Sequence, residues 1–78
     1  MAKRRGETLR LHDRVVNNEA LPGVPAGTRG KVILVEGFAW TRYRVLFETD
    51  VPNGTDIGSL DRSALTLVDK KGNPVPVG

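Results

Sequence analysis

Polar and apolar side chains alternate along the segment RYRVLFE, residues 42–48. Because successive side chains of a β-strand point to opposite faces, Tyr43, Val45 and Phe47 fall on one face and mostly charged residues fall on the other. Burial of a Phe side chain stabilises a folded protein by roughly 1.5–3 kcal/mol. The alternation therefore predicts a strand whose three apolar residues point into the core.

Runs of β-branched and apolar residues, punctuated by Gly and Pro, predict four further strands, and no window of ten or more residues has helical spacing. The first run can break at His12-Asp13, where two polar residues interrupt it. The five expected strands are Leu9–Val16, Lys31–Glu36, Arg42–Glu48, 56–59 and 66–68. This pattern places the chain in the all-β class.

Two segments between the later strands carry recognisable turn chemistry. Pro52-Asn53-Gly54 predicts a hairpin turn, because Asn and Gly tolerate a positive φ. Residues 60–65, LDRSAL, predict one helical turn that the Asp61 side chain can cap. The chain is therefore expected to make a single helical turn just before its last strand.

The segment at residues 19–28 contains two Pro and two Gly, which exclude a central strand and predict a long loop. We expect Gly27 and Gly30 to form the turn and the bulge that lead into the second strand. The expected organisation is a flexible basic arm at residues 1–6, a folded domain at 7–69 and a disordered tail at 70–78.

Four segments, HDRVV, PAGTRGKV, YRVLF and LDRSAL, together resemble a small SH3-like barrel of the kind seen in bacterial KOW-type domains. The resemblance covers about residues 9–68 and extends to short actinobacterial proteins with a W-x-R-Y-x-V-x-F strand. It implies a five-stranded SH3-like barrel with a short helical turn before the last strand, a flexible N-terminal arm and a C-terminal tail. Closure into a barrel removes the exposed edges of a small sheet.

Basic residues gather at the N-terminal end of the chain. Residues 1–14 carry five bases and two acids, residues 48–61 carry four acids and no base, and the whole chain has a net charge of +3. Clustered bases attract phosphate groups. The charge distribution therefore permits a nucleic-acid partner without requiring one.

The chain lacks the residue combinations that most catalytic sites need. Cysteine is absent and His12 is the single histidine, so we expect no disulfide, no zinc site and no catalytic triad. Ser59 and Ser63 lie outside any nucleophile-elbow motif. The segment TDIGSL also lacks the Gln and Tyr of the Val-Gln-Ile-Tyr strand used by SH3-like type II dihydrofolate reductases. We therefore expect a non-enzymatic protein without a cofactor.

No apolar run follows the basic N-terminus, and no segment approaches the ~20 apolar residues that a membrane span needs. We therefore expect a cytoplasmic protein that makes no membrane contact.

Trp40 and the two arginines that follow it allow two interpretations. Trp40 can be a lid over the end of the barrel, which we favour because a small domain needs the buried area, or an exposed platform for base stacking. Arg42 and Arg44 can form a solvated face paired with Glu36, or part of a positive surface that contacts nucleic acid.

The resemblance to KOW-type domains implies that the loop before the second strand contacts RNA, which makes Arg29 and Lys31 candidates. The first hypothesis is a binding module for nucleic acid, RNA rather than duplex DNA. Its expected contact residues are Lys3, Arg4, Arg5, Arg29, Lys31, Trp40, Arg42 and Arg44. The alternative is a protein-interaction adaptor that holds a partner in the barrel groove, beside Trp40 and the loop at residues 18–28.

Overall fold

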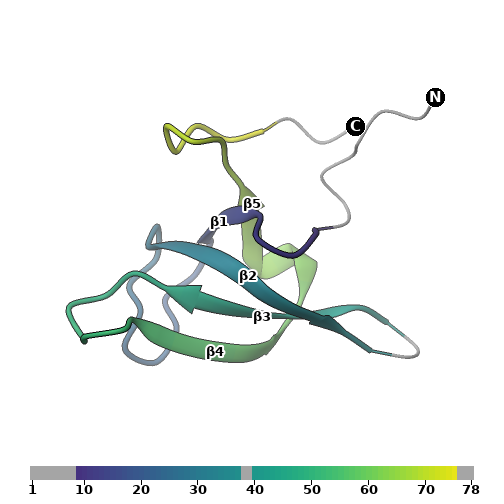
Figure 1. Ribbon diagram of the computed structural model, residues 1–78, viewed down its shortest axis with the longest axis horizontal. Coiled ribbons are helices and arrows are strands. Elements are labelled where there is room, and N and C mark those ends of the chain that lie inside the picture. The colour runs from purple at the N-terminus through teal and green to yellow at the C-terminus, as the bar shows by residue number, and fades with distance from the viewer. Residues whose placement is uncertain (1–8, 38–39, 76–78) are drawn as a thin grey trace.

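A computed structural model describes residues 9–37 and 40–75 of the chain. Five antiparallel strands form one sheet in the order β4-β3-β2-β1-β5 (Figure 1). The elements are β1 (Arg14–Asn17), β2 (Arg29–Glu36), β3 (Arg42–Phe47), β4 (Thr55–Leu60), the 3₁₀ turn η1 (Arg62–Ala64) and β5 (Leu65–Leu67). The expected all-β fold, with one helical turn before the last strand, is confirmed.

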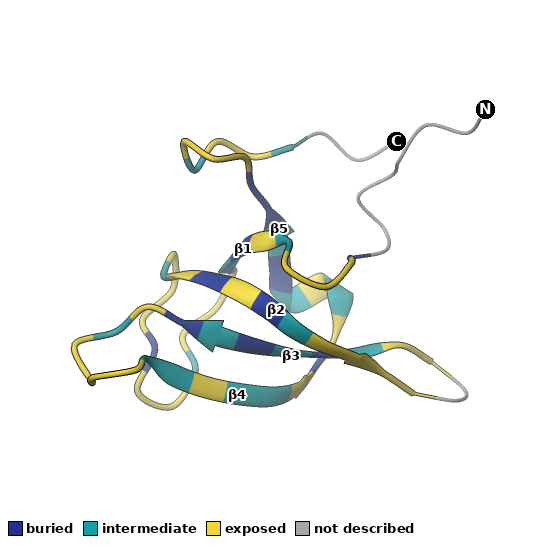
Figure 2. Cartoon of the chain, viewed as in Figure 1, coloured by how far each residue is buried: buried dark blue, intermediate teal, exposed yellow. Residues whose placement is uncertain are grey.

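The concave face of the curled sheet carries the hydrophobic core. Tyr43, Val45 and Phe47 on β3 are at most 1 % exposed, as their alternation predicts. Buried and exposed positions also alternate along the first half of β2 (Figure 2). Val15 of β1 and Val32 of β2 are fully buried among the same residues. The core therefore sits between the inner faces of β1, β2 and β3.

The first strand begins later than the sequence predicts. Residues 9–13 form a turn, because the Asp13 carboxylate accepts the Arg10 N–H at 2.7 Å and the Asp13 N–H bonds the Arg10 carbonyl. His12 takes a left-handed conformation, with φ 71°. Leu9 nevertheless reaches the core, where its N–H donates to the Tyr43 hydroxyl at 3.1 Å. The expected strand at Leu9–Val16 is therefore wrong over its first five residues.

A buried asparagine organises the long loop after β1. Asn17 is 2 % exposed, and its side-chain amide donates to the Glu19 and Val24 carbonyls at 2.8 and 3.3 Å. Its side-chain oxygen accepts the Thr28 N–H at 2.8 Å. Satisfied polar groups of this kind can be buried without a large cost. The loop is therefore tied to the barrel at both ends.

Gly30 has a different role from the expected bulge. It lies inside β2, where an added Cβ would come within 2.6 Å of Val45 Cγ1 and 2.9 Å of Phe47 Cδ1. The bulge in β2 instead falls between Val32 and Leu34. Gly30 thus makes room for the large side chains of β3.

The turn after β3 follows the sequence prediction, with Asn53 and Gly54 at φ 71° and 78°. The prediction for Asp61 holds only for its position, since it precedes η1 but its side chain makes no capping hydrogen bond. The Asp61 backbone carbonyl instead accepts the Ala64 N–H at 3.0 Å. A single 3₁₀ turn closed in this way leaves few N–H groups for a side-chain cap.

The two edge strands are treated differently. Residues 70–75, the first part of the segment expected to be a tail, fold back on β5, where the Val75 N–H donates to the Leu67 carbonyl at 2.8 Å. The outer edge of β4 pairs with no other described strand. The ladder between β4 and β3 is interrupted where two residues of β4, Gly58 and Ser59, face a single residue of β3. Ser59 takes a left-handed conformation there, with φ 58°.

Asp69 holds the turn that covers β5, and its ionisation should control that turn. Its carboxylate accepts the Lys71 and Asn73 N–H groups at 2.8 and 2.9 Å, and the bond from Asn73 is the main reason that the pKa of Asp69 lies below its ordinary value of 3.8. A carboxyl with a lowered folded-state pKa stabilises the turn above the ordinary value and loses this effect as pH falls through the lowered value.

We therefore expect the Lys71 and Asn73 amide resonances to lose their hydrogen-bonded shifts on acidification through this range, as measured by NMR. Asp69→Asn should abolish this dependence, and an unchanged titration in the variant would assign it to another group.

Candidate nucleic-acid interface

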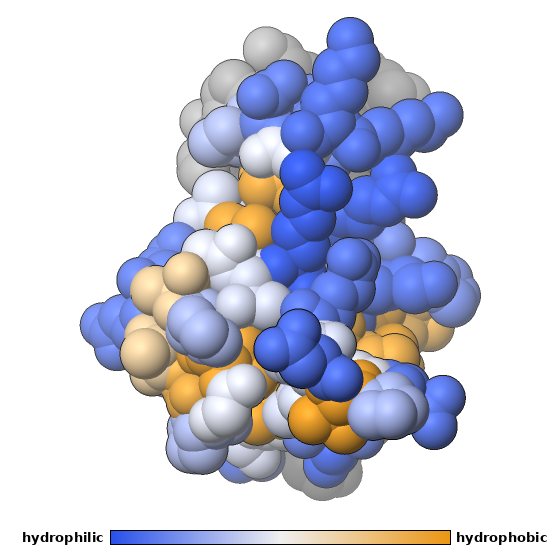
Figure 3. Space-filling view, turned by 90° about the vertical axis from the view of Figure 1, so that its left-hand side faces the viewer, coloured by the Kyte–Doolittle hydropathy of each residue, from blue (hydrophilic) through white to orange (hydrophobic). Residues whose placement is uncertain are grey.

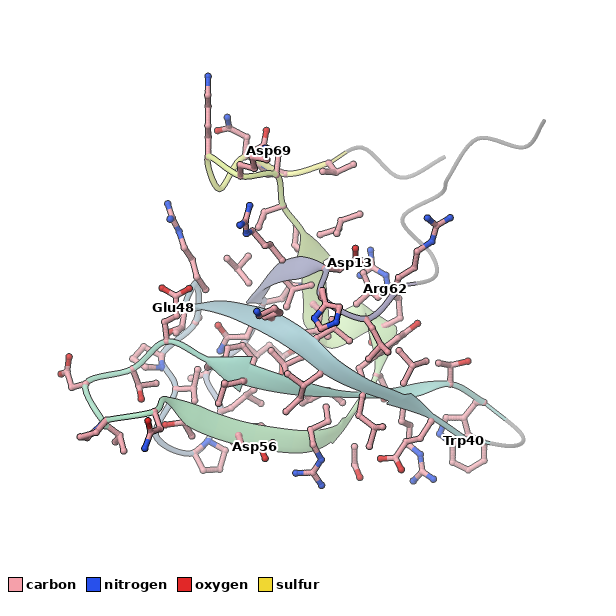
Figure 4. All side chains as sticks on the ribbon, viewed as in Figure 1. Asp13, Trp40, Glu48, Asp56, Arg62 and Asp69 are labelled. Atoms are coloured by element: carbon pink, nitrogen blue, oxygen red, sulfur yellow. The ribbon has the colours of Figure 1, made fainter. Side chains whose placement is uncertain are left out.

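Trp40 lies at the end of the β2–β3 hairpin, which extends beyond the barrel (Figures 1 and 4). Its side chain is 62 % exposed, so the expected lid over the core is wrong. The hairpin carries the residue past the end of the barrel, and the core is filled without it. The alternative interpretation, an exposed aromatic surface, matches the geometry.

The Arg42 side chain lies over the exposed indole. Its guanidinium carbon is 5.3 Å from the centroid of the Trp40 ring, within the range of a cation–π interaction. Such contacts at exposed sites contribute about 0.5–1 kcal/mol. Among the described residues, Arg42 Nε is shielded from solvent and has no hydrogen-bond partner. The stacked arginine therefore restrains the indole and places a positive charge beside it.

Arg44 is committed to a different contact. Its Nη1 lies 2.9 Å from Asp56 Oδ1 on β4, rather than beside Glu36 as one interpretation expected. Glu36 stands opposite Arg42 in the β2–β3 register. The side chains of Arg44 and Asp56 are 41 % and 48 % exposed, so their ion pair is worth under about 1 kcal/mol. Arg44 can still offer its remaining N–H groups to a ligand on this face.

The sequence did not single out the apolar surface of the same hairpin. Leu34 and Val35 are 42 % and 36 % exposed, and with Trp40 they make the hairpin unusually apolar for a solvated element. The bulge after Val32 shifts the alternation of β2, so consecutive apolar residues become exposed. A nearly continuous apolar run such as KVILVE contains no alternation from which this could be predicted.

On the described part of the chain, the expected contact residues fall into two groups. Arg29 and Lys31 form one group, and Trp40, Arg42 and Arg44 form the other. Lys31 lies five positions before Glu36, the partner of Arg42, which places Lys31 and Glu36 roughly 17 Å apart along β2. Arg29 and Lys31 are exposed at the start of β2, far from Trp40. Lys3, Arg4 and Arg5 lie outside the described residues. The structure thus does not join all eight candidates into one patch.

A basic groove surrounds Arg29 and Lys31. One hollow of about 390 Å³ is lined by His12, Arg14, Gly30, Lys31 and Glu48. A second hollow of about 230 Å³ shares Arg14, Gly30 and Glu48 and adds Val15, Arg29, Val68, Asp69, Lys70 and Gly72. We call these two hollows together the basic groove. Figure 4 shows Glu48 at the left of the sheet and Asp69 above the sheet, both far from Trp40 at the lower right.

Among the His, Arg and Lys residues that line the basic groove, three were not sequence candidates: His12, Arg14 and Lys70. Figure 3, which faces this side of the molecule, shows a band of hydrophilic surface running down it beside smaller hydrophobic areas. For Arg14 a signal existed, since Val15 points inward and its neighbour must therefore point outward. For Lys70 there was none, because the fold alone brings residues 69–72 beside β2.

The fold and these surfaces can be compared with known proteins. A family model for the Xrn1 SH3-like domain matches residues 7–69. The chain belongs to the Xrn1 SH3-like domain family. No curated protein and no solved structure matched the chain in two further comparisons.

As a member of the Xrn1 SH3-like family, the chain is a domain of a type that serves as a binding module. Within residues 9–37 and 40–75, no helix is long and apolar enough to cross a membrane. The same part of the chain contains no group of three or more His, Asp or Glu side chains that could hold a metal ion.

The SH3-like domain does not bring together the two parts of the expected adaptor site. Trp40 lies at one end of the β2–β3 ribbon, whereas the loop at residues 18–28 lies near the opposite end (Figures 1 and 4). The loop is also internally bonded, through Asn17 and the paired Leu21 and Val24. A partner that contacts Trp40 would therefore meet the hairpin rather than this loop.

Proposed function

We propose that this SH3-like domain binds single-stranded nucleic acid, RNA in preference to duplex DNA, and has no catalytic activity of its own. The observation that carries the proposal is the exposed Trp40 ring with the Arg42 guanidinium stacked 5.3 Å from its centroid. A base can stack on an exposed indole for about 1–3 kcal/mol, provided that it is not already paired inside a duplex. The adjacent arginine supplies the charge that a phosphate requires.

Electrostatics supports the same proposal. Arg14, Arg29 and Lys31 are exposed on the outer face of β1 and β2, and Arg42 lies on the outer face of β3. Cations distributed along one strand ribbon can follow a flexible phosphate backbone. The resemblance to KOW-type domains favours RNA contact at the start of β2, and the absence of cysteine is consistent with the cytoplasmic location that we propose.

The salt dependence of binding tests the proposal. If three or four phosphates are neutralised, the affinity for a labelled single-stranded RNA should fall about 20- to 50-fold between about 50 and 200 mM salt. Fluorescence anisotropy measures this fall, with a duplex DNA of equal length as the comparison. Binding that ignores salt, or no binding even at low salt, would refute the proposal.

A second candidate function is supported by the apolar character of the hairpin. Leu34, Val35 and Trp40 together expose the kind of surface that binds another protein. In that case a pull-down treated with nuclease would still retain one specific protein, and Trp40→Ala would release it. Retention of RNA alone, lost after nuclease treatment, would favour the first function.

A further inference from the structure

We propose that the basic groove binds the terminal phosphate of the nucleic-acid strand, an inference that rests on the proposed function. The groove lies at the start of β2, at the other end of the ribbon from Trp40 (Figure 4). It would give the domain a preference for a phosphorylated strand end, beyond the general attraction to phosphates along the strand.

The first argument is an unbalanced pair of like charges. Arg14 of β1 stands directly opposite Lys31 of β2 on the exposed face of the antiparallel ladder. Like charges in directly opposed positions destabilise a sheet. An anion between the two side chains would convert this repulsion into two favourable contacts.

The second argument is the lack of internal partners. Within the described ranges of the chain, the side chains of Arg14, Arg29, Lys31 and Lys70 make no hydrogen bond or ion pair, whereas Arg44 is paired with Asp56. These four cations line the groove against two carboxylates, Glu48 and Asp69. The net charge of the groove is therefore +2.

The Asp69 carboxylate already accepts two backbone N–H groups, which leaves Glu48 as the freer of the two acids. An ionised phosphomonoester carries about −1.5 to −2 charge near neutral pH, whereas a phosphodiester within a strand carries one. The charge of the groove therefore complements a strand end better than an internal phosphate.

The third argument is the backbone at His12. Its φ of 71° is uncommon for a residue other than glycine, and its N–H is bonded to the Val32 carbonyl at 2.8 Å. Residues held in such conformations cluster at ligand sites, where the surrounding structure imposes them. Here the conformation belongs to a residue that lines the same hollow as Arg14 and Lys31.

The size of the hollows is consistent with this ligand. Together they provide room for a phosphate and the adjoining sugar, since ligand sites commonly span about 300–1,000 Å³. Glu48 borders both hollows and can accept a hydrogen bond from a sugar hydroxyl. A carboxylate in this place opposes a second phosphate and thus favours the end of a strand.

The test compares three otherwise identical single-stranded RNAs, which carry a 5′-phosphate, a 3′-phosphate or neither. A phosphate on one end should tighten binding about tenfold, because it forms charge-assisted hydrogen bonds that the hydroxyl end lacks. In the double variant Arg14→Gln/Lys31→Gln this gain should fall below about twofold. The double variant Arg10→Gln/Lys71→Gln removes the same charge from outside the groove and should retain the full gain.

A titration of the wild-type protein with inorganic phosphate, followed by amide NMR shifts at His12 and Lys31, separates the two proposals. RNA binding with no effect of end phosphates, and no shift at these amides, would overturn the groove inference and leave the proposed function intact. Shifts at these amides without any RNA binding would refute the proposed function and restrict the groove to small phosphate anions, which also overturns the strand-end inference. An equal gain in both double variants would equally overturn it.

Discussion

Replacing Phe47 with alanine should lower the free energy of unfolding by about 3–5 kcal/mol, one of the largest effects expected of a single change in the chain. Phe47 is 0 % exposed and is among the largest fully buried side chains. Its ring and Val45 lie against Gly30, where an added methyl group would already collide with them. A domain of 78 residues has a total stability of only about 4–12 kcal/mol, so the loss is a large fraction.

Urea denaturation followed by far-ultraviolet circular dichroism measures this change. Trp40 fluorescence is a poor probe, because the indole is already exposed in the folded state. Leu46→Ala provides the matched control, since Leu46 is the preceding residue of β3 and points to the outer face. It should cost under about 1 kcal/mol. Equal losses in the two variants would contradict the inward orientation of Phe47.

Replacing Trp40 with alanine should weaken RNA binding about 5- to 150-fold, which corresponds to the loss of about 1–3 kcal/mol of base stacking. The free energy of unfolding should change by no more than about 1 kcal/mol, because the exposed side chain contributes little to the core and loses only its contact with Arg42. Anisotropy with a single-stranded RNA measures the first quantity, and urea denaturation measures the second.

Two further variants make this result specific. Trp40→Phe keeps an aromatic face and should retain much of the affinity. Val51→Ala removes another exposed apolar side chain, 57 % exposed in the turn after β3, and should leave binding unchanged. If Trp40→Ala binds RNA as tightly as the native chain, the hairpin is not the stacking surface.

Local sequence patterns predicted most of the fold. The alternation around Val45 predicted which side chains of β3 are buried, and Asn53-Gly54 predicted the turn after it. Each of these signals acts through neighbours in the chain. The predicted start of β1 was wrong, and the cause is also local. The side chain of Asp13 bonds the Arg10 backbone and favours a turn over an extended chain.

The candidate site was predicted less well, because its geometry depends on contacts between distant segments. The position of Trp40 depends on how far the β2–β3 hairpin extends beyond the barrel, which no local pattern determines. The sheet order places β5 beside β1, and this order brings Lys70 to a groove that Arg14 and Lys31 also line. The spacing of Arg14, Lys31 and Lys70 in the sequence does not indicate that they line one groove.

The irregular ladder of β4 also bears on how copies of this chain behave when crowded together. The outer edge of β4 offers N–H and C=O groups with which a strand of a neighbouring molecule can pair. The extra residue at Gly58-Ser59 twists this edge and interrupts the row of available groups. We infer that this single local defect protects the domain against fibril growth, the common hazard of small sheets with an open side.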